Sequence, residues 1–326
     1  MKYISVDTDK QLVFAHQPHP VIDEDECLIK VVAVGVNRAD LLQRHGKYPA
    51  PAGESSILGL EACGDIVECG RQVNGWKVGD KVFALVAGGG YSEFVKVKAT
   101  QLIKLPQNLT YQQGAATAEV FLTAYQSLFT IAQLTAGDKV LIHAGASGVG
   151  SAAIQLAKAK KCQVVVTVGS EVKAKACLAL GADHVVNYHE EDFVQWAKVH
   201  VKNGFDVIVD VVGGDYVNKN IQVAALDGRI VILSMLGGRY SESIDIAKLL
   251  MKRITVTAST LRNRDEHYKA KLVNDFSTDF YPLLINGEIK PVIDSTFPWQ
   301  SADTAHKKMA NNENIGKLIL EIPSTY

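Results

Sequence analysis

Residues 140–150 read VLIHAGASGVG, and a segment of helical composition, SAAIQLAKAKK, follows them directly. A β-branched run therefore leads into a glycine-rich turn and then into a helix. In that context a glycine motif predicts a dinucleotide site, because the turn brings the backbone close to a pyrophosphate and the helix N-terminus offers free N–H groups. The alternative is a glycine turn without a ligand.

Each position of the loop has an expected role. Gly145 permits the tight turn, Gly148 allows close approach of a pyrophosphate, and Gly150 lets the helix pack on the strand. Ser147 stands where many such loops have another glycine, and its hydroxyl can donate to a phosphate. Val149 completes the predicted phosphate site.

Six short apolar runs alternate with helical stretches from about residue 139 onward. They cover residues 140–144, 163–168, 184–188, 206–212, 229–234 and 254–259. This alternation is typical of βαβ units around a parallel sheet, and the Val/Ile content predicts burial of both faces. We expect an α/β fold in which a doubly wound parallel sheet spans residues 119–261.

The rest of the chain forms the other predicted domain, 1–118 together with 262–326. Short β-branched runs separated by glycine turns indicate a mostly β structure, interrupted by one helix at 37–45. After Leu261 we expect a helix to about residue 289, then one or two strands, including 317–322, that return to the first domain.

Composition excludes several classes. The 326 residues carry 34 Lys and Arg against 35 Asp and Glu, without the basic excess typical of nucleic-acid binding. Five cysteines without a CxxC pair argue against a disulfide framework and a four-cysteine zinc lobe. The N-terminus lacks a signal sequence, and polar residues interrupt the apolar stretch 120–137. We expect a cytoplasmic protein without a membrane segment.

The end of the second βαβ strand predicts which nucleotide binds. NAD sites place a carboxylate there, whereas this strand ends in Val168, Gly169 and Ser170, with Lys173 one helical turn later. A cation and hydroxyl donors suit a 2′-phosphate, so we predict NADPH. Glu171 fits as a dipole partner of the following helix. The alternative for Lys173 is an ordinary solvated lysine.

Four further stretches carry a family resemblance: VGVNRADLLQRHGKYP (34–49), GLEACGDIVECG (59–70), HAGASGVG (143–150) and NIGKLILEIP (314–323). They resemble the medium-chain dehydrogenase/reductase superfamily, and more narrowly its zinc-free quinone oxidoreductases, including the tumour-suppressor-inducible type. The resemblance covers essentially the whole chain. It implies a GroES-like β domain, a Rossmann domain, and NADPH-dependent hydride transfer in the cleft between them.

Two departures from the zinc-dependent relatives predict a metal-free site. Those relatives have cysteine where this chain has Asn37 and histidine where it has Leu60. Asp40 and Glu61 alone do not provide the three ligands that catalytic zinc needs. Without a Lewis acid, the acceptor should be intrinsically electrophilic, such as a quinone or an activated alkene.

The resemblance also assigns residues to the acceptor and the cofactor. Tyr48 is the leading acceptor-side residue, through ring stacking and a hydroxyl donor; the alternative is a core or surface tyrosine. Asn37 would orient the cofactor or the substrate oxygen, or else only cap a helix. Tyr188 resembles an aromatic near the adenosine phosphate. The positions expected to line the nicotinamide end are Thr123, Leu233, Ser234, Met235, Ser259, Leu261, Asn314 and Lys317.

The first hypothesis is an NADPH-dependent quinone reductase that transfers hydride or single electrons. Two alternatives stay open. One is an enone or alkenal reductase, which also needs a proton donor. The other is a non-enzymatic NADPH-binding protein acting as a sensor, a crystallin-like protein or an RNA binder. Relatives commonly pair their last Rossmann strand, here 254–259, so we also expect a homodimer.

Overall fold

The computed structural model describes residues 1–323, which form two compact units. Unit 1 comprises Met1–Leu122 and the described part of Leu261–Tyr326, and unit 2 comprises Thr123–Thr260. The chain therefore leaves unit 1, forms unit 2 as one continuous segment, and returns to complete unit 1.

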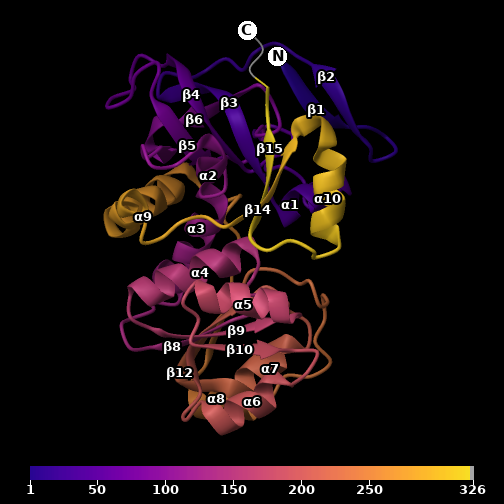
Figure 1. Ribbon diagram of the computed structural model, residues 1–326, viewed down its shortest axis with the longest axis vertical. Helices are drawn as coiled ribbons and strands as arrows, with labels where there is room; N and C mark the ends of the chain where they lie inside the picture. Colours follow the sequence, from indigo (N-terminus) through magenta and orange to yellow (C-terminus); the bar gives the residue numbers. More distant parts are fainter. Residues whose placement is uncertain (324–326) are drawn as a thin grey trace. The chain divides into compact units, whose positions relative to one another are not determined.

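Unit 2 is built on six parallel strands in the order β10-β9-β8-β11-β12-β13 (Figure 1). Their bounds are β8 Lys139–Ile142, β9 Gln163–Val168, β10 His184–Asn187, β11 Phe205–Asp210, β12 Ala224–Ile232 and β13 Thr255–Ala258. The order reverses between β8 and β11, as in a doubly wound Rossmann sheet. The predicted parallel sheet is confirmed.

Helices follow the strands of unit 2 along the chain. They are α4 Gly148–Ala159, α5 Glu171–Ala179, α6 Phe193–His200, α7 Tyr216–Val223 and α8 Ile246–Lys252. A π-helical segment, Gln126–Ile131, precedes β8 and continues α3 (Ala118–Tyr125). The helices cover the sheet, so β8 and β9 are almost fully buried, as their Val/Ile content predicts.

The last strand departs from that prediction. Thr255, Val256 and Ala258 of β13 are exposed, because β13 pairs with β12 on one side and ends the sheet on the other. The expectation that both faces of this strand are buried is therefore wrong. A β-branched run does not distinguish a central strand from an edge strand, since both favour the same residues.

Unit 1 contains a seven-stranded sheet and a separate hairpin. The sheet strands are β3 Glu26–Val36, β4 Glu61–Cys69, β5 Lys81–Leu85, β6 Phe94–Lys98, β7 Leu102–Lys104, β14 Ile293–Pro298 and β15 Lys317–Glu321. Strand β1 (Lys2–Val6) pairs antiparallel with β2 (Leu12–His16). The mostly antiparallel pairing confirms the predicted GroES-like fold class.

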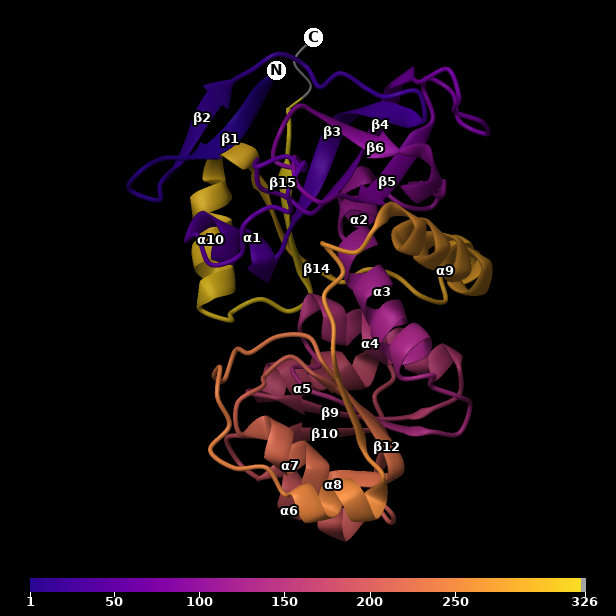
Figure 2. The same cartoon turned by 180° about the vertical axis from the view of Figure 1, so that it is seen from behind.

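The C-terminal segment completes this sheet, as predicted. Strand β15 pairs antiparallel with β3, and β14 lies parallel beside β15 (Figure 2). The helices of unit 1 are α1 Arg38–Arg44, α2 Tyr111–Ala115, α9 Glu266–Asn286 and α10 Ala302–Ala310, with short 3-10 helices at Ala99–Gln101 and Trp299–Ser301. The structure confirms the helix predicted at 37–45, whereas the sequence analysis missed α10 between β14 and β15.

Unit 1 has its own hydrophobic core. Ile29, Ile66, Val82 and Leu318 are fully buried in it.

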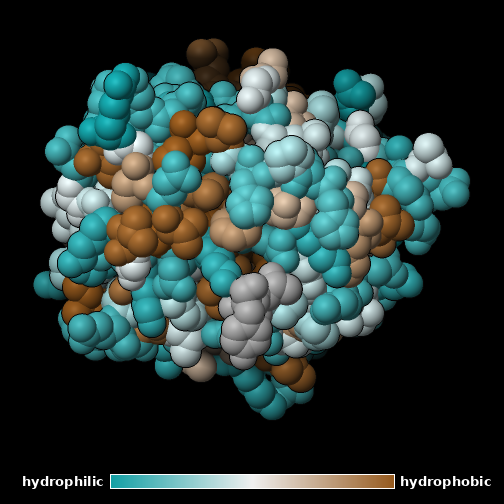
Figure 3. All heavy atoms as spheres, turned by 90° about the horizontal axis from the view of Figure 1, so that it is seen from above, coloured by the Kyte–Doolittle hydropathy of each residue, from teal (hydrophilic) through white to brown (hydrophobic). Residues whose placement is uncertain are grey.

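Figure 3 shows hydrophobic patches interspersed with hydrophilic side chains on the face seen from above. Within residues 1–323, no helix is both long enough and apolar enough to cross a bilayer.

Candidate functional site

The glycine loop joins β8 to α4. Ser147 is the N-cap of α4, and its hydroxyl oxygen accepts the amide of Gly150 at 3.0 Å. A Cβ on Gly150 would lie 2.4 Å from the Ala144 carbonyl oxygen, and one on Gly145 would lie 2.6 Å from Val166 Cβ. Gly145 and Gly150, two of the three predicted glycines, are thus required because neighbouring backbone or strand atoms leave no room for a side chain.

The first turn of α4 provides hydrogen-bond donors for an anion. The amides of Gly148 and Val149 lie at the helix N-terminus, where the helix itself offers no acceptors and the dipole favours negative charge. The Ser147 hydroxyl accepts from Gly150 and keeps its own proton to donate. These groups suit a pyrophosphate.

The end of β9 brings four predicted residues together. Gly169 follows the strand, and Ser170 caps α5 by accepting the amide of Lys173 at 3.4 Å. A Cβ on Gly169 would lie 2.3 Å from the Tyr188 hydroxyl, so only glycine permits this approach of the tyrosine. Glu171, the neighbouring acid, pairs with a lysine of the same helix.

A polar pocket of about 300 Å³ adjoins Tyr188. Its lining residues are Tyr188, His189, Glu190, Glu191, Asp192, Phe193, Tyr216 and Lys219. Asp192 caps α6 and pairs with Lys219 at 2.7 Å. The pocket therefore combines the aromatic rings of Tyr188, Phe193 and Tyr216 with three acidic side chains and one lysine beside the end of β9.

Sequence reasoning missed a buried network below the glycine loop. His143 Nε2 lies 2.8 Å from Asn220 Oδ1, and Asn220 Nδ2 donates to Asp210 at 2.9 Å. Since the amide oxygen can only accept, His143 donates through Nε2, and its Nδ1 accepts from Thr167 at 3.0 Å. Burial lowers the pKa of His143, which favours this neutral form.

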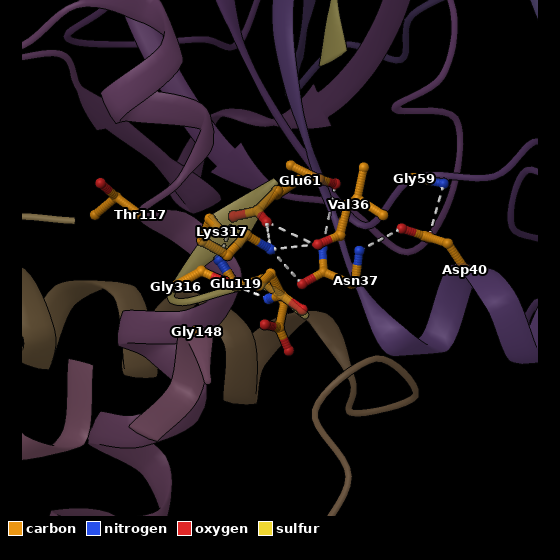
Figure 4. Close-up of polar contacts among 12 residues, drawn as sticks. Val36, Asn37, Asp40, Gly59, Glu61, Thr117, Glu119, Gly148, Gly316 and Lys317 are labelled. Carbon is orange, nitrogen blue, oxygen red and sulfur yellow. Dashed lines mark hydrogen bonds and ion pairs between the residues drawn. The ribbon is translucent and has the colours of Figure 1, made fainter. Parts of the chain in front are cut away.

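A second buried network occupies unit 1, between β3, β4 and β15 (Figure 4). The Lys317 ammonium donates to Val36 O at 2.8 Å and to Asn37 Oδ1 at 2.6 Å, and it pairs with Glu61 at 2.7 Å. Asn37 Nδ2 donates to Glu61 Oε1 at 3.0 Å. The side chains of Lys317 and Glu61 are 3% and 0% exposed. Asn37 and Lys317, two predicted site residues, therefore contact each other, and the Glu61 carboxylate binds both.

Asp40 extends this network toward α10. Its carboxylate accepts the amides of Asn37 at 2.8 Å and Gly59 at 3.1 Å, as well as the Tyr91 hydroxyl at 3.3 Å. Burial raises the pKa of Asp40 to about 6. The Tyr91 oxygen also lies 3.0 Å from His306 Nε2, and burial lowers the pKa of His306 to about 3.

Arg262 holds Tyr48, the predicted acceptor-side residue. The guanidinium carbon lies 5.3 Å from the centre of the Tyr48 ring, and Nη1 donates to the Tyr48 carbonyl at 3.3 Å. Its remaining donors bind Ala87 O and Gln43 Oε1. Burial raises the pKa of Tyr48, so its hydroxyl stays protonated. Nothing in the local sequence indicates this long-range clamp.

The other predicted nicotinamide-end residues divide between the units. In unit 2, the amide of Leu233 donates to Asp210 O at 2.7 Å, the amide of Ser259 donates to Ile232 O at 2.9 Å, and Thr123 O accepts from Ser127. Met235, which follows Ser234 beyond β12, is 62% exposed. Their roles toward a cofactor stay predictions.

In unit 1, Leu261 is buried and Asn314 Nδ2 donates to Gly316 O at 2.7 Å. The Ser259 hydroxyl of unit 2, by contrast, is buried without a hydrogen-bond partner. Within residues 1–323, no three His, Cys, Asp or Glu side chains form a group arranged to hold a metal ion.

Comparison with known proteins agrees with this architecture. The alcohol dehydrogenase GroES-like domain model matches residues 23–107, and the zinc-binding dehydrogenase model matches residues 148–277. The mouse synaptic vesicle membrane protein VAT-1 homolog is 31% identical over 92% of this chain and 77% of its own length. The mouse quinone oxidoreductase is 30% identical over 92% of this chain and 90% of its own length.

A solved structure, Escherichia coli quinone oxidoreductase complexed with NADPH, superimposes with a TM-score of 0.87 at 27% identity, covering 99% of this chain and 100% of the other. The fold and these matches define the class: the chain belongs to the medium-chain dehydrogenase/reductase superfamily, a family of NAD(P)H-dependent oxidoreductases. Within it, the chain is similar to quinone oxidoreductases and VAT-1 homologues.

Proposed function

We propose that this protein is an NADPH-dependent quinone reductase that passes hydride, or single electrons, to a quinone without a metal ion. The observation that carries the proposal is the end of β9, where Gly169, Ser170, Lys173 and Tyr188 come together and no carboxylate stands at the strand tip. A carboxylate there would repel a 2′-phosphate, whereas a lysine and a hydroxyl attract one.

The remaining cofactor contacts follow from donors on unit 2. The amides of Gly148 and Val149 suit the pyrophosphate, and the aromatic pocket beside Tyr188 suits the adenosine end. Bound NADPH supplies the reducing equivalents. The protein supplies fixed donors, so that binding needs little reorganisation of the loop.

The network around Glu61 supports a metal-free reaction. A zinc ion needs three protein ligands with free lone pairs. Glu61 instead faces the ammonium of Lys317 and the amide of Asn37, and Asp40 accepts two backbone amides and a tyrosine hydroxyl. Because the residues present do not fit a metal, the acceptor must be electrophilic by itself, as quinones are.

We assign Tyr48 to the acceptor. The Arg262 cation holds its ring, and the protonated hydroxyl donates to the oxygen on which charge develops. Asn37 cannot turn freely, because Glu61 and Lys317 fix both ends of its amide. Its amide oxygen keeps a second lone pair for a donor on the cofactor or substrate.

Substitution of Lys173 tests the cofactor assignment. Lys173→Ala should raise the KM for NADPH about tenfold while leaving the KM for NADH nearly unchanged, since a charged hydrogen bond contributes about 1.5–3 kcal/mol. The matched control is Lys175→Ala, two residues further along α5 and therefore on the other side of the helix. Equal loss with both cofactors, or the same change in the control, would contradict the assignment.

An acceptor panel tests the reaction class. Steady-state rates with 1,2-naphthoquinone and 1,4-benzoquinone should exceed those with alkenals, and Tyr48→Phe should lower kcat by removing the hydroxyl donor. Fast alkenal reduction with slow quinone turnover would favour the alkene reductase. Tight NADPH binding without turnover on any acceptor would favour a non-enzymatic role.

We also propose a homodimer formed through β13. Strand β13 is at the edge of the sheet and has β12 as its one neighbour. Exposed apolar side chains come from the segment that precedes β13 in the chain and from β13 itself. The exposed side chains are Met235, Leu236, Tyr240, Ile244, Ile246, Leu250, Met251 and Val256. A second β13 would satisfy the free backbone groups of the edge. Light scattering should give twice the chain mass, and Val256→Asp should give the monomer mass.

A further inference from the structure

Two cysteines face each other across neighbouring strands of unit 1. Cys27 lies near the start of β3 and Cys69 ends β4, and the two are direct partners in the antiparallel register. Their sulfur atoms are 3.8 Å apart. The amide of Gly70 donates to the Glu26 carbonyl at 2.8 Å, so the adjacent Cys27–Cys69 pair occupies the non-hydrogen-bonded position, where side chains approach most closely.

The two thiols differ in accessibility. Cys27 is fully buried, and burial together with the neighbouring Cys69 raises its pKa to about 12. Its S–H donates to Cys69 Sγ. Cys69 is partly exposed. An oxidant from solvent therefore reaches Cys69 first, with a second thiol already in contact behind it.

We propose that Cys27 and Cys69 form a reversible redox pair that hydroperoxides convert to a cross-strand disulfide. Cys69 attacks the peroxide oxygen, which gives a sulfenic acid and releases water or an alcohol. Cys27 then attacks the Cys69 sulfur, and a second water leaves with the thiol proton. With hydrogen peroxide, two thiols lose two electrons and two protons, and one peroxide becomes two waters.

The backbone geometry suits the bond. Cα atoms at a non-hydrogen-bonded antiparallel position lie about 4.5 Å apart, inside the range of about 4.4–6.8 Å found in disulfides. Closure therefore needs side-chain rotation rather than movement of the strands. In a reducing compartment such as the cytoplasm, the location expected from the sequence, the reduced pair is the resting state and oxidation is transient.

The pair is remote from the buried network around Glu61. Glu61 begins β4 and Cys69 ends it, so eight residues of extended strand, about 26 Å, separate them. A disulfide at this end would leave the Asn37–Lys317 cluster in place. It would join residues 42 positions apart and so restrict the unfolded chain of unit 1, which stabilises the folded form.

Peptide mapping of the full-length protein tests the linkage. After treatment with hydrogen peroxide and alkylation of the remaining thiols under denaturing conditions, the protein should carry three alkylated cysteines instead of five. Trypsin places Cys27 in peptide 11–30 but leaves Cys63 and Cys69 together in peptide 48–71; cleavage before Asp65 separates those two. The expected linkage joins Cys27 to Cys69 and disappears with dithiothreitol.

Variants test the order of events. Cys69→Ala should abolish the linkage, whereas Cys63→Ala, a buried cysteine of the same strand, should keep it. In Cys27→Ala, dimedone should trap a sulfenic acid on Cys69 that wild type does not accumulate. The oxidised wild type should melt several degrees above the reduced form, and Cys69→Ala should show no shift.

Several outcomes would overturn the proposal. They are linkage of any other cysteine pair, accumulation of sulfinic acid on Cys69 in wild type, and equal dimedone trapping in wild type and Cys27→Ala. The mapping on wild type decides the matter even if a variant fails to fold.

Discussion

Each unit contains a buried polar network beside a proposed ligand site, and the two networks are built from different groups. In unit 1, full charges are buried: the Lys317 ammonium pairs with Glu61, and both hold Asn37. In unit 2, neutral groups run from Thr167 to His143 to Asn220 and end at the buried Asp210 carboxylate, which accepts hydrogen bonds from uncharged N–H donors. An ion pair holds the unit 1 network, whereas uncharged donors hold the single carboxylate of the unit 2 network.

This difference between the networks predicts that substitutions in them lower the free energy of unfolding by unequal amounts. A buried charge that loses its partner has neither water nor a counter-ion, whereas a neutral group loses one hydrogen bond. Removing the centre of each network should therefore cost more in unit 1 than in unit 2. Substitutions of Lys317, His143 and His306 test this ranking.

Lys317→Met should give the largest loss. It leaves Glu61 buried without its cation, and breaking a buried pair in this way costs about 3–5 kcal/mol of the free energy of unfolding. Urea unfolding of the wild type and the variant measures the loss. The matched control is Lys307→Met, which breaks an ion pair of an exposed lysine with Asp303 and should cost less than about 0.5 kcal/mol.

If Lys317→Met costs no more than the control, the cluster is not electrostatically organised and the comparison fails. The double variant Lys317→Met/Glu61→Gln should recover part of the loss, because it removes the unpaired charge.

His143→Leu should cost about 2 kcal/mol, less than Lys317→Met. The substitution leaves Asn220 Oδ1 and the Thr167 hydroxyl without their partner, but no buried charge becomes unpaired. His143→Gln should cost less, since an amide can replace one of the two hydrogen bonds. Amide hydrogen exchange of unit 2 measures the change in its free energy of unfolding. A loss larger than that caused by Lys317→Met would reverse the ranking.

His306→Gln should show the smallest and most pH-dependent effect. Burial lowers the pKa of His306 to about 3, below the usual value near 6.5, so the unfolded chain binds the proton more tightly between these values. Its neutral form therefore stabilises the fold above about pH 6.5, and this contribution falls as the pH decreases. Asp40, whose pKa is raised to about 6, acts in the opposite direction between about pH 4 and 6.

The unfolding free energy of wild type relative to that of His306→Gln should consequently fall by about 2 kcal/mol from pH 7 to pH 5, so that the variant becomes the more stable protein at pH 5, because the contribution of Asp40 is common to both. The control is His267→Gln on the exposed face of α9. A difference that stays constant with pH would show that His306 is not held neutral.

The sequence could predict much of the fold. Apolar runs at 140–144 and 163–168 identified parallel strands, and the glycine spacing after the first located the turn before α4. These features are local, because strand, turn and cap preferences depend on neighbouring residues. The missing carboxylate after Val168 was equally visible, since it is a property of one strand end.

Local pattern could not predict edge exposure or helix α10. Strand β13 has the composition of a central strand, and its exposure depends on which strands pair with it. The helix α10 is short and rich in polar residues, so its fold depends on packing against β14 and β15.

Local sequence patterns therefore specify the fold class, the glycine loop and the candidate residues along the chain. The partners of those residues depend on the tertiary fold, which places Lys317 beside Asn37 and Glu61, Arg262 against Tyr48, and Cys27 opposite Cys69. The members of each pair are distant along the chain and meet through strand order and packing, which no short stretch of sequence encodes.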